Sequence, residues 1–235
     1  MNISCYNSIP GQPIAYWISK ELRHTFFVWK PLSEFAAPKK GLSTGNNDVF
    51  LRLWYEVSNM NTCCNATDTI YAMYTGKKWF PICKGGLFRK WYGNNDYLVN
   101  FQYNGKELQN NEQAIIRNPN YYFGESLTWT DLTTGKISVR FNEKGFIQDV
   151  AGPCIFNLGT NNYYLLGLLN SKVADSVLSI TSPTLHFNVG NICDFPMILK
   201  KSVRLDDLVQ KNIEISRRDW DSFETSWDFK KHPLI

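Results

Sequence analysis

From Leu127 to Val150 the chain reads LTWTDLTTGKISVRFNEKGFIQDV, and these residues give the clearest pattern of strands in the sequence. Its segments 127–132, 137–141 and 146–150 are short and rich in β-branched and aromatic residues, and the Thr-Gly and Lys-Gly pairs between them favour turns. Short strands separated by tight turns are typical of an antiparallel meander. The stretch therefore predicts three consecutive antiparallel strands.

Helices are expected on both sides of these strands. Leucine and valine side chains recur at helical spacing from Asn162, a residue suited to an N-cap, as far as Ser182, where Pro183 ends the pattern. Apolar residues at helical spacing also predict a helix within 14–28. The segment 203–212 is expected to form a further short helix.

Two further strands complete the expected sheet. A glycine-rich loop at 39–47 leads into a predicted strand at 49–57. Another predicted strand, at 97–103, ends in Asn104-Gly105, a pair that favours a hairpin turn. We therefore expect an α/β fold of the α+β type, in which helices pack against a twisted and mostly antiparallel sheet.

The composition is that of a globular protein. The 235 residues are 43% hydrophobic and 15% aromatic, which is ample for a packed core, and the formal net charge is only +4. This charge permits a polyanionic partner if the cations are clustered. No segment has the run of about 18 apolar residues that a membrane span needs, and the first residues lack the pattern of a secretory signal. We therefore expect a cytoplasmic protein that binds no membrane.

The cysteines and histidines show no metal-ligand pattern. None of the 6 cysteines lies in a CxxC pair, and the 3 histidines have no metal-ligand spacing. The thiols are expected to be reduced and mostly buried. If the chain has a reactive thiol, we expect it in the Cys63-Cys64 pair, which lies in a polar segment.

The sequence motifs of nucleotide-binding and methyl-transfer sites are missing. Neither GxxxxGK[ST] nor GxGxxG occurs in the chain. An enzyme that methylates a base amino group needs a cofactor loop and an Asn/Asp-Pro-Pro-aromatic motif for the flipped base. The nearest string, Asn118-Pro119-Asn120-Tyr121, has the wrong third residue and is expected to form a turn.

Hydrolytic motifs are missing as well. The acids that a metal-dependent nuclease would need match no such motif and are expected on the surface: Asp48, Glu56, Asp68, Glu107 and Glu112. No GxSxG string occurs, and His186 is expected to be buried or to face DNA. We therefore predict no catalytic residue, no metal ligand and no cofactor site in this chain, which alone is not expected to be an enzyme.

A run of cations and aromatics at 76–93, GKKWFPICKGGLFRKWYG, contains no acid and has a Gly-Gly pair at its centre. Lysine and arginine neutralise phosphates, glycine lets the backbone approach a ligand, and aromatic rings offer flat faces to bases. The run therefore predicts a nucleic-acid contact loop. In the alternative reading, the aromatics belong to the core and the cations lie on a solvated face.

Four strings in the chain resemble one protein family. They are Ile9-Pro10-Gly11-Gln12-Pro13-Ile14-Ala15-Tyr16-Trp17, Gly41-Leu42-Ser43-Thr44-Gly45-Asn46-Asn47-Asp48 with Phe50-Leu51-Arg52, Lys84-Gly85-Gly86 with Arg89-Lys90-Trp91-Tyr92-Gly93-Asn94, and Leu166-Gly167-Leu168-Leu169-Asn170-Ser171-Lys172 with Pro183-Thr184-Leu185-His186-Phe187. The chain thereby resembles the C-terminal part of PglX, the adenine-specific DNA methyltransferase of BREX phage-defence systems. It is more loosely similar to the target-recognition domains of type IIG enzymes and type I specificity subunits.

The resemblance implies that the chain has three parts with different roles. Residues 1–30 would form an N-terminal connecting helix, 31–200 a DNA target-recognition domain, and 201–235 a C-terminal extension toward another domain. In the family, the catalytic half carries S-adenosylmethionine and an Asn-Pro-Pro-Tyr motif, and it lies upstream of the matched region. The expected partners are therefore duplex DNA, a methyltransferase catalytic domain on the same protein or another chain, and other subunits of the defence system.

Residue chemistry and the resemblance together give a set of candidate DNA contacts. Arginine can bind guanine through two hydrogen bonds, and asparagine can pair with adenine. The first loop and the basic run would flank one groove if they converge. The residues expected to contact DNA are Lys39, Lys40, Thr44, Asn46, Asn47, Arg52, Lys77, Lys78, Lys84, Gly85, Gly86, Arg89, Lys90, Trp91, Tyr92, Asn94, Arg117, Thr130 and Arg140.

Two other functions are open at this point. The chain could be an assembly module whose C-terminal aromatics, Trp220, Phe223, Trp227 and Phe229, are exposed and bind a partner protein. It could also be a nuclease in its own right, in which case one of the acids named above would be needed for metal-dependent cleavage.

Overall fold

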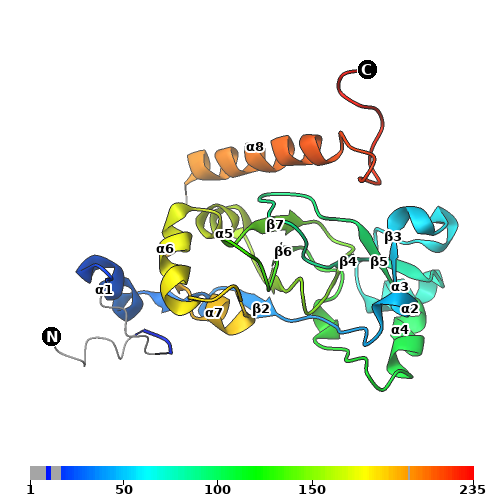
Figure 1. Cartoon of the computed structure of the whole chain (residues 1–235), viewed down its shortest axis with the longest axis horizontal. Coiled ribbons are helices and arrows are strands. Elements are labelled where there is room, and N and C mark those ends of the chain that lie inside the picture. The colour runs from blue at the N-terminus through cyan, green and yellow to red at the C-terminus, as the bar shows by residue number, and fades with distance from the viewer. Residues whose placement is uncertain (1–8, 12–16, 201) are drawn as a thin grey trace.

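The computed structural model describes residues 9–11, 17–200 and 202–235. Over these residues the fold is mixed α and β, with antiparallel and mixed sheets, as the sequence predicts. The described strands form two four-stranded sheets and one two-stranded pairing. The two larger sheets lie side by side along the long axis of the molecule (Figure 1).

The first sheet contains the first two predicted strand segments of 127–150. Its order is β2 (Ala37–Lys39), β9 (Cys154–Phe156), β6 (Ser126–Trp129) and β7 (Val139–Asn142), and all its pairs are antiparallel. The predicted pairing of the first two segments of the stretch is thus confirmed. Strand β9, which was not predicted, pairs with the other side of β6.

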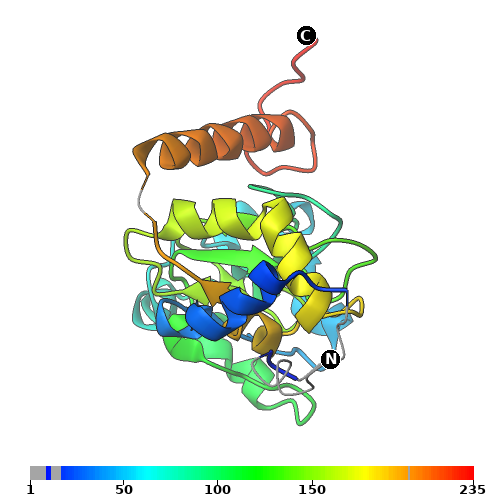
Figure 2. The same cartoon turned by 90° about the vertical axis from the view of Figure 1, so that its left-hand side faces the viewer.

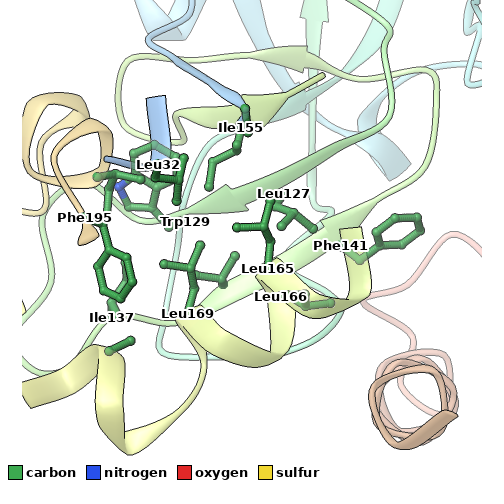
Figure 3. Packing of buried hydrophobic residues seen from close by; sticks show 14 of the residues in the cluster. Leu32, Leu127, Trp129, Ile137, Phe141, Ile155, Leu165, Leu166, Leu169 and Phe195 are labelled. Atoms are coloured by element: carbon green, nitrogen blue, oxygen red, sulfur yellow. The ribbon is translucent and has the colours of Figure 1, made fainter. Parts of the chain in front are cut away.

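Helices on one side of this sheet bury its main core. Leu165, Leu166 and Leu169 of α5 (Asn162–Leu169) point toward Leu127 and Trp129 of β6 (Figure 3). In α5 the buried leucines follow the helical period, whereas all four residues of β6 are buried. The same core includes residues of α6 (Lys172–Thr181) and α7 (Val189–Cys193).

The single helix predicted from Asn162 to Ser182 is instead two helices. Asn170 leaves the helix, and its side-chain amide bonds both the N–H and the C=O of Val139 on β7, each at 2.9 Å. Ser171 then caps α6 by accepting from the N–H of Ala174. A polar side chain that competes with the helical backbone therefore ends one helix and starts the next.

The second sheet has the order β3 (Leu51–Leu53), β5 (Tyr97–Asn100), β4 (Trp79–Cys83) and β8 (Ile147–Gln148). Strand β8 lies parallel to β4, whereas the other pairs are antiparallel. The predicted meander is therefore wrong for its third segment. Within 146–150, Ile147 and Gln148 form β8 and pair with β4 of the second sheet instead of β7, and Ile147 is fully buried in a separate core.

Two other predicted strands are shorter than expected. The segment 49–57 begins in a helical turn, α2 (Asn47–Phe50), which the Asn46 side chain caps, and only Leu51–Leu53 is strand. Strand β5 ends at Asn100, and Asn104 and Gly105 adopt left-handed conformations inside α4 (Gln102–Gln109) instead of a hairpin turn. The short helix α3 (Thr69–Thr75) precedes β4, and single 3-10 turns occur at Leu32–Glu34, Trp54–Glu56, Asn59–Asn61 and Pro119–Tyr121.

The two ends of the chain pack on the outside of this body. Helix α1 (Lys20–Val28) leads to β1 (Lys30–Pro31), which pairs with β10 (Pro196–Met197). The part of the predicted first helix at 14–16 lies outside the described residues. Helix α8 (Val203–Trp220) is much longer than the predicted short helix and lies across α5 (Figures 1 and 2), with Val209 against Gly167.

The expected exposure of the C-terminal aromatics is only partly correct. Trp220 is buried, and the ring of Trp227 packs on that of Phe146 at 6.0 Å between centroids. Phe223 is half-exposed. Trp220 is the last residue of α8, and it is buried together with Val209 and Ile213 because these residues lie on the apolar face of that helix. The sequence shows this helical period only weakly among the many charges of the segment. Throughout the described ranges, the helices are too short or too polar to cross a membrane.

Candidate nucleic-acid interface

Residues 84–94, which form most of the connection from β4 to β5, are called the basic loop here. Gly85 and Gly86 take φ values of 85° and 114°, which favour glycine. A Cβ at Gly85 would lie 2.8 Å from the carbonyl oxygen of Ala151, so the loop backbone passes close to its neighbour. The Gly-Gly pair therefore serves the shape of the loop itself.

The basic loop is anchored at both ends of its tip. The N–H of Trp91 donates to Val139 at 2.9 Å, and the N–H of Phe141 donates back to Trp91 at 2.8 Å, so the loop adds a bridge to the edge of β7. The side chain of Asn94 donates to the Leu87 carbonyl at 2.8 Å, and the Thr130 hydroxyl donates to Gly86 at 3.1 Å. These bonds hold the loop in one shape.

Arg140 lies beneath the basic loop and is only 1% exposed. Its Nη1 and Nη2 donate to the carbonyls of Arg89 and Gly85, both at 3.4 Å. No ion pair with a carboxylate is found for it among the residues that the structure describes. Burial lowers the pKa of Arg140 to about 10. Since a buried guanidinium cannot reach a phosphate, Arg140 supports the loop and does not offer the predicted DNA contact.

Three other predicted contacts are also covered by protein. Thr44 is 3% exposed and donates to Asn47 Oδ1 at 2.6 Å. Tyr92 is 8% exposed, lies under the guanidinium of Arg217 at 4.6 Å, and has its pKa raised to about 12 by burial. Gly85 is buried as well. The side chains of Thr44 and Tyr92 and the backbone of Gly85 are therefore covered in this structure.

The first loop and the basic loop do converge. Lys84 Nζ lies 3.4 Å from Asn47 Oδ1 and 3.0 Å from Asp149 Oδ2. The Asp149 side chain is completely buried, and its pKa is raised by burial although Lys84 lowers it. One buried carboxylate thus holds the lysine of one loop beside the asparagine of the other. No motif or spacing in the sequence indicates this role of Asp149.

A hollow of about 420 Å³ opens where the loops meet. Arg52, Lys84 and Asn47 contribute donors to its wall, and Asp48 and Glu56 contribute acids. The Arg52 Nη1 donates to the carbonyls of Asp48 and Leu51, both at 2.6 Å, which fixes the guanidinium at the rim. Mixed donors and acceptors suit the edges of bases better than the uniformly negative phosphates.

Two of the predicted cations, Lys77 and Lys78, lie away from this hollow. Lys77 and Lys78 precede β4, whereas Lys84 follows it, so roughly 16 Å of strand separates them at the usual rise per residue. Lys77 donates to the Met60 carbonyl, and Lys78 lies 3.7 Å from Glu107. These two lysines therefore belong to a different part of the surface.

The remaining predicted contacts have partners within the chain. Lys40 lies 3.5 Å from Asp131, which also lies 3.5 Å from the exposed His186, and Lys39 lies 5.5 Å from the Tyr121 ring. Arg89 pairs with Asp219 of α8 at 2.9 Å, and Lys90 donates to the Asn170 carbonyl at 2.7 Å. Arg117 is half-buried, and Asn46 is exposed at the start of α2. DNA would have to compete with these partners.

The structure also bears on the other chemistry considered above. Within the described ranges, no group of three His, Cys, Asp or Glu side chains could hold a metal ion. The pKa of Cys64 is raised to about 11, mainly by partial desolvation and also by the neighbouring Cys63 and Asp228. A raised pKa disfavours the thiolate of Cys64 at neutral pH, and the reactivity of the Cys63-Cys64 pair stays a prediction.

Replacing Lys84 with methionine is expected to destabilise the fold most at neutral and alkaline pH. The change leaves the buried Asp149 carboxylate without its cation, which typically costs about 3–5 kcal/mol. The pKa of Asp149 then rises further, so the folded state holds a proton that the unfolded state releases. The unfolding free energy of the variant should therefore increase as pH falls toward the pKa of free aspartate.

Urea unfolding of the Lys84→Met variant at about pH 5 and about pH 8 checks this prediction. The double variant Lys84→Met, Asp149→Asn serves as the control, because it has no buried carboxylate and should recover stability mainly at the higher pH. An equal loss at both pH values would mean that the ion pair is not responsible.

The chain can now be placed beside known proteins. No protein-family model matches it. Over nearly its whole length it is similar to proteins named as adenine-specific methyltransferases. It is 43% identical to the adenine-specific methyltransferase BrxX of Escherichia coli O9:H4 (strain HS) and 36% identical to the adenine-specific methyltransferase PglX of Lacticaseibacillus casei (strain Zhang). Each match covers 98% of this chain but only 18% and 20% of the respective relative, so the chain spans about a fifth of their length.

Proposed function

We propose that this chain binds duplex DNA as the target-recognition part of a site-specific adenine DNA methyltransferase in a BREX-type phage-defence system. The observation that carries the proposal is the similarity to BrxX and PglX along 98% of the chain. The finer assignment to target recognition rests on the basic loop and on the hollow beside it, since both offer hydrogen-bond donors at an exposed surface.

The proposal assigns different tasks to the two parts of this surface. Cations of the basic loop, such as Arg89 and Lys90, would contact phosphates and set the register of the protein on the duplex. Arg52, Lys84 and Asn47 around the hollow would read base edges. Methyl transfer itself would need the S-adenosylmethionine site of a catalytic domain, which this chain would serve by holding the target adenine in place.

A segment exchange tests target recognition. The matching segment of E. coli BrxX would be replaced by this chain, and methylated adenines in DNA exposed to the hybrid enzyme would be mapped by sequencing. We expect the hybrid to methylate a new short motif. Methylation of the motif that unmodified BrxX uses would show that the segment does not select the site.

Selection of bound duplexes from a random pool by the purified chain gives an independent test of the same proposal. Enrichment of one short motif supports sequence recognition. Binding without any enriched motif would leave only an electrostatic role for the chain.

A second candidate function is an assembly module, and an exposed apolar patch favours it. Ile70, Tyr71, Met73 and Tyr74 of α3 are 65%, 43%, 39% and 80% exposed, and Met60 is 80% exposed. Exposed apolar patches often bind other proteins. The double variant Ile70→Ser, Tyr74→Ser separates the two functions. Loss of association with other subunits, with DNA binding unchanged, would assign assembly to this patch.

A further inference from the structure

The tip of the basic loop carries two large apolar side chains. Leu87 is 86% exposed and Phe88 is 57% exposed. They lie between Lys84 on one side and Arg89 and Lys90 on the other, and Lys90 Nζ lies 5.8 Å from the centre of the Phe88 ring. Because exposed leucine and phenylalanine gain nothing from contact with water, an apolar tip flanked by cations is suited to contact with a partner.

The tip is also held in place from behind. The Leu87 carbonyl accepts from Asn94, the Gly86 carbonyl accepts from Thr130, and the carbonyls of Gly85 and Arg89 accept from the buried Arg140. A loop whose backbone is bonded at these four positions is preorganised and does not fold its apolar side chains back into the core.

The surroundings of the tip indicate what it contacts. Flanking cations favour an anionic partner, and the apolar side chains favour one with an apolar interior directly behind its charges. Duplex DNA has this arrangement, because phosphates border a stack of flat bases. A membrane of anionic lipids shares part of this chemistry, but the hollow beside the loop offers side-chain donors and acceptors that match base edges.

We propose that Leu87 and Phe88 form a wedge that enters the base stack of bound duplex DNA, separates one base-pair step and bends the duplex there. The proposal rests on the DNA-binding function proposed above. Apolar side chains inserted at such a step are a known way for proteins to kink DNA while flanking cations hold the phosphates. Insertion from one groove opens the base stack on that side, so the duplex would bend away from the tip.

The test uses the full chain and the duplex that it selects from a random pool. Two readouts are taken on each protein: 2-aminopurine fluorescence, with the probe placed at successive adenine positions, and energy transfer between dyes at the two duplex ends. Wild type is expected to raise the fluorescence severalfold at one step and to shorten the end-to-end distance. The double variant Leu87→Ala, Phe88→Ala should bind with an unchanged salt dependence but lose both signals.

The double variant Phe27→Ala, Leu208→Ala is the matched control. It removes one exposed phenylalanine from α1 and one exposed leucine from α8, which are 76% and 53% exposed, and it should keep both signals. Thermal unfolding should be the same for all three proteins, because every substituted side chain is exposed.

The outcomes separate the two proposals. Wild type that binds the duplex without either signal, or tip variants that keep both signals, would overturn the wedge and leave DNA binding intact. Wild type that binds no duplex at all would overturn DNA binding itself. Binding to vesicles of anionic phospholipid that the tip substitutions abolish, with no distortion of DNA, would assign the tip to a membrane surface and overturn the wedge.

Discussion

A Gly41→Ala variant is expected to lose most of its stability, or to fold only with the first loop displaced. A Cβ at Gly41 would fall on the backbone carbonyl of Gln148 in β8, far closer than real Cβ atoms approach. The Leu42 N–H also donates to the Gln148 carbonyl at 2.9 Å, so the two backbones are already bonded at this point. Because neither backbone can move without breaking the contact of the first loop with the second sheet, we expect a loss above about 3 kcal/mol.

Gly135→Ala is the control for this prediction. No atom lies within 4 Å of the position where its Cβ would be, so the change in unfolding free energy should be within about 0.5 kcal/mol. Chemical denaturation of both variants measures the difference. If Gly41→Ala is as stable as Gly135→Ala, the close approach of the first loop to β8 is incorrect, and so is the placement of Asn47 beside Lys84.

The second large effect is expected at Trp129. Its side chain is fully buried on β6 beneath α5, and its Nε1 donates to the Phe187 carbonyl at 2.7 Å. Trp129→Ala should cost about 3–5 kcal/mol through the cavity that it leaves. The unpaired Phe187 carbonyl should add to this loss.

The variant Trp129→Phe separates the two contributions, because it keeps most of the ring but not the donor. Its loss should be nearer about 1–3 kcal/mol, the usual cost of a buried group left without a partner. Equal losses for the alanine and phenylalanine variants would mean that the cavity contributes little. In that case the hydrogen bond, and not packing, would be the main role of this tryptophan.

The sequence predicts those parts of the fold that depend on local patterns. The pairing of β6 with β7 is predicted from two alternating segments, although the connection between the strands, 130–138, is longer than the expected tight turn. The destination of the next segment does not, because 146–150 has the same local pattern whether it pairs with β7 or, as found, with β4. Partner choice between two sheets depends on packing distant in the sequence, such as the burial of Ile147 in the second core.

In the candidate site, too, some features follow from local sequence patterns and others depend on tertiary structure. The sequence shows that cations cluster near Gly85-Gly86. It does not show whether the first loop and the basic loop converge, so the shared groove could be predicted only on the condition that they do. Which cations face solvent could not be predicted, since Arg140 on β7 has the same residue type as Arg89 yet lies beneath the loop. The buried carboxylate of Asp149, which holds Lys84, is also invisible without the tertiary structure.

The most direct test of DNA binding is a fluorescence anisotropy titration of the purified chain against random-sequence duplex over a salt series. We expect the binding constant to fall as salt rises, with a slope that decreases by about 1 for each of Arg89→Ala and Lys90→Ala. Lys136→Ala, which removes an exposed lysine that pairs with Asp175, should change nothing. Absence of binding at the lowest salt, or equal effects of all three substitutions, would contradict a DNA interface at the basic loop.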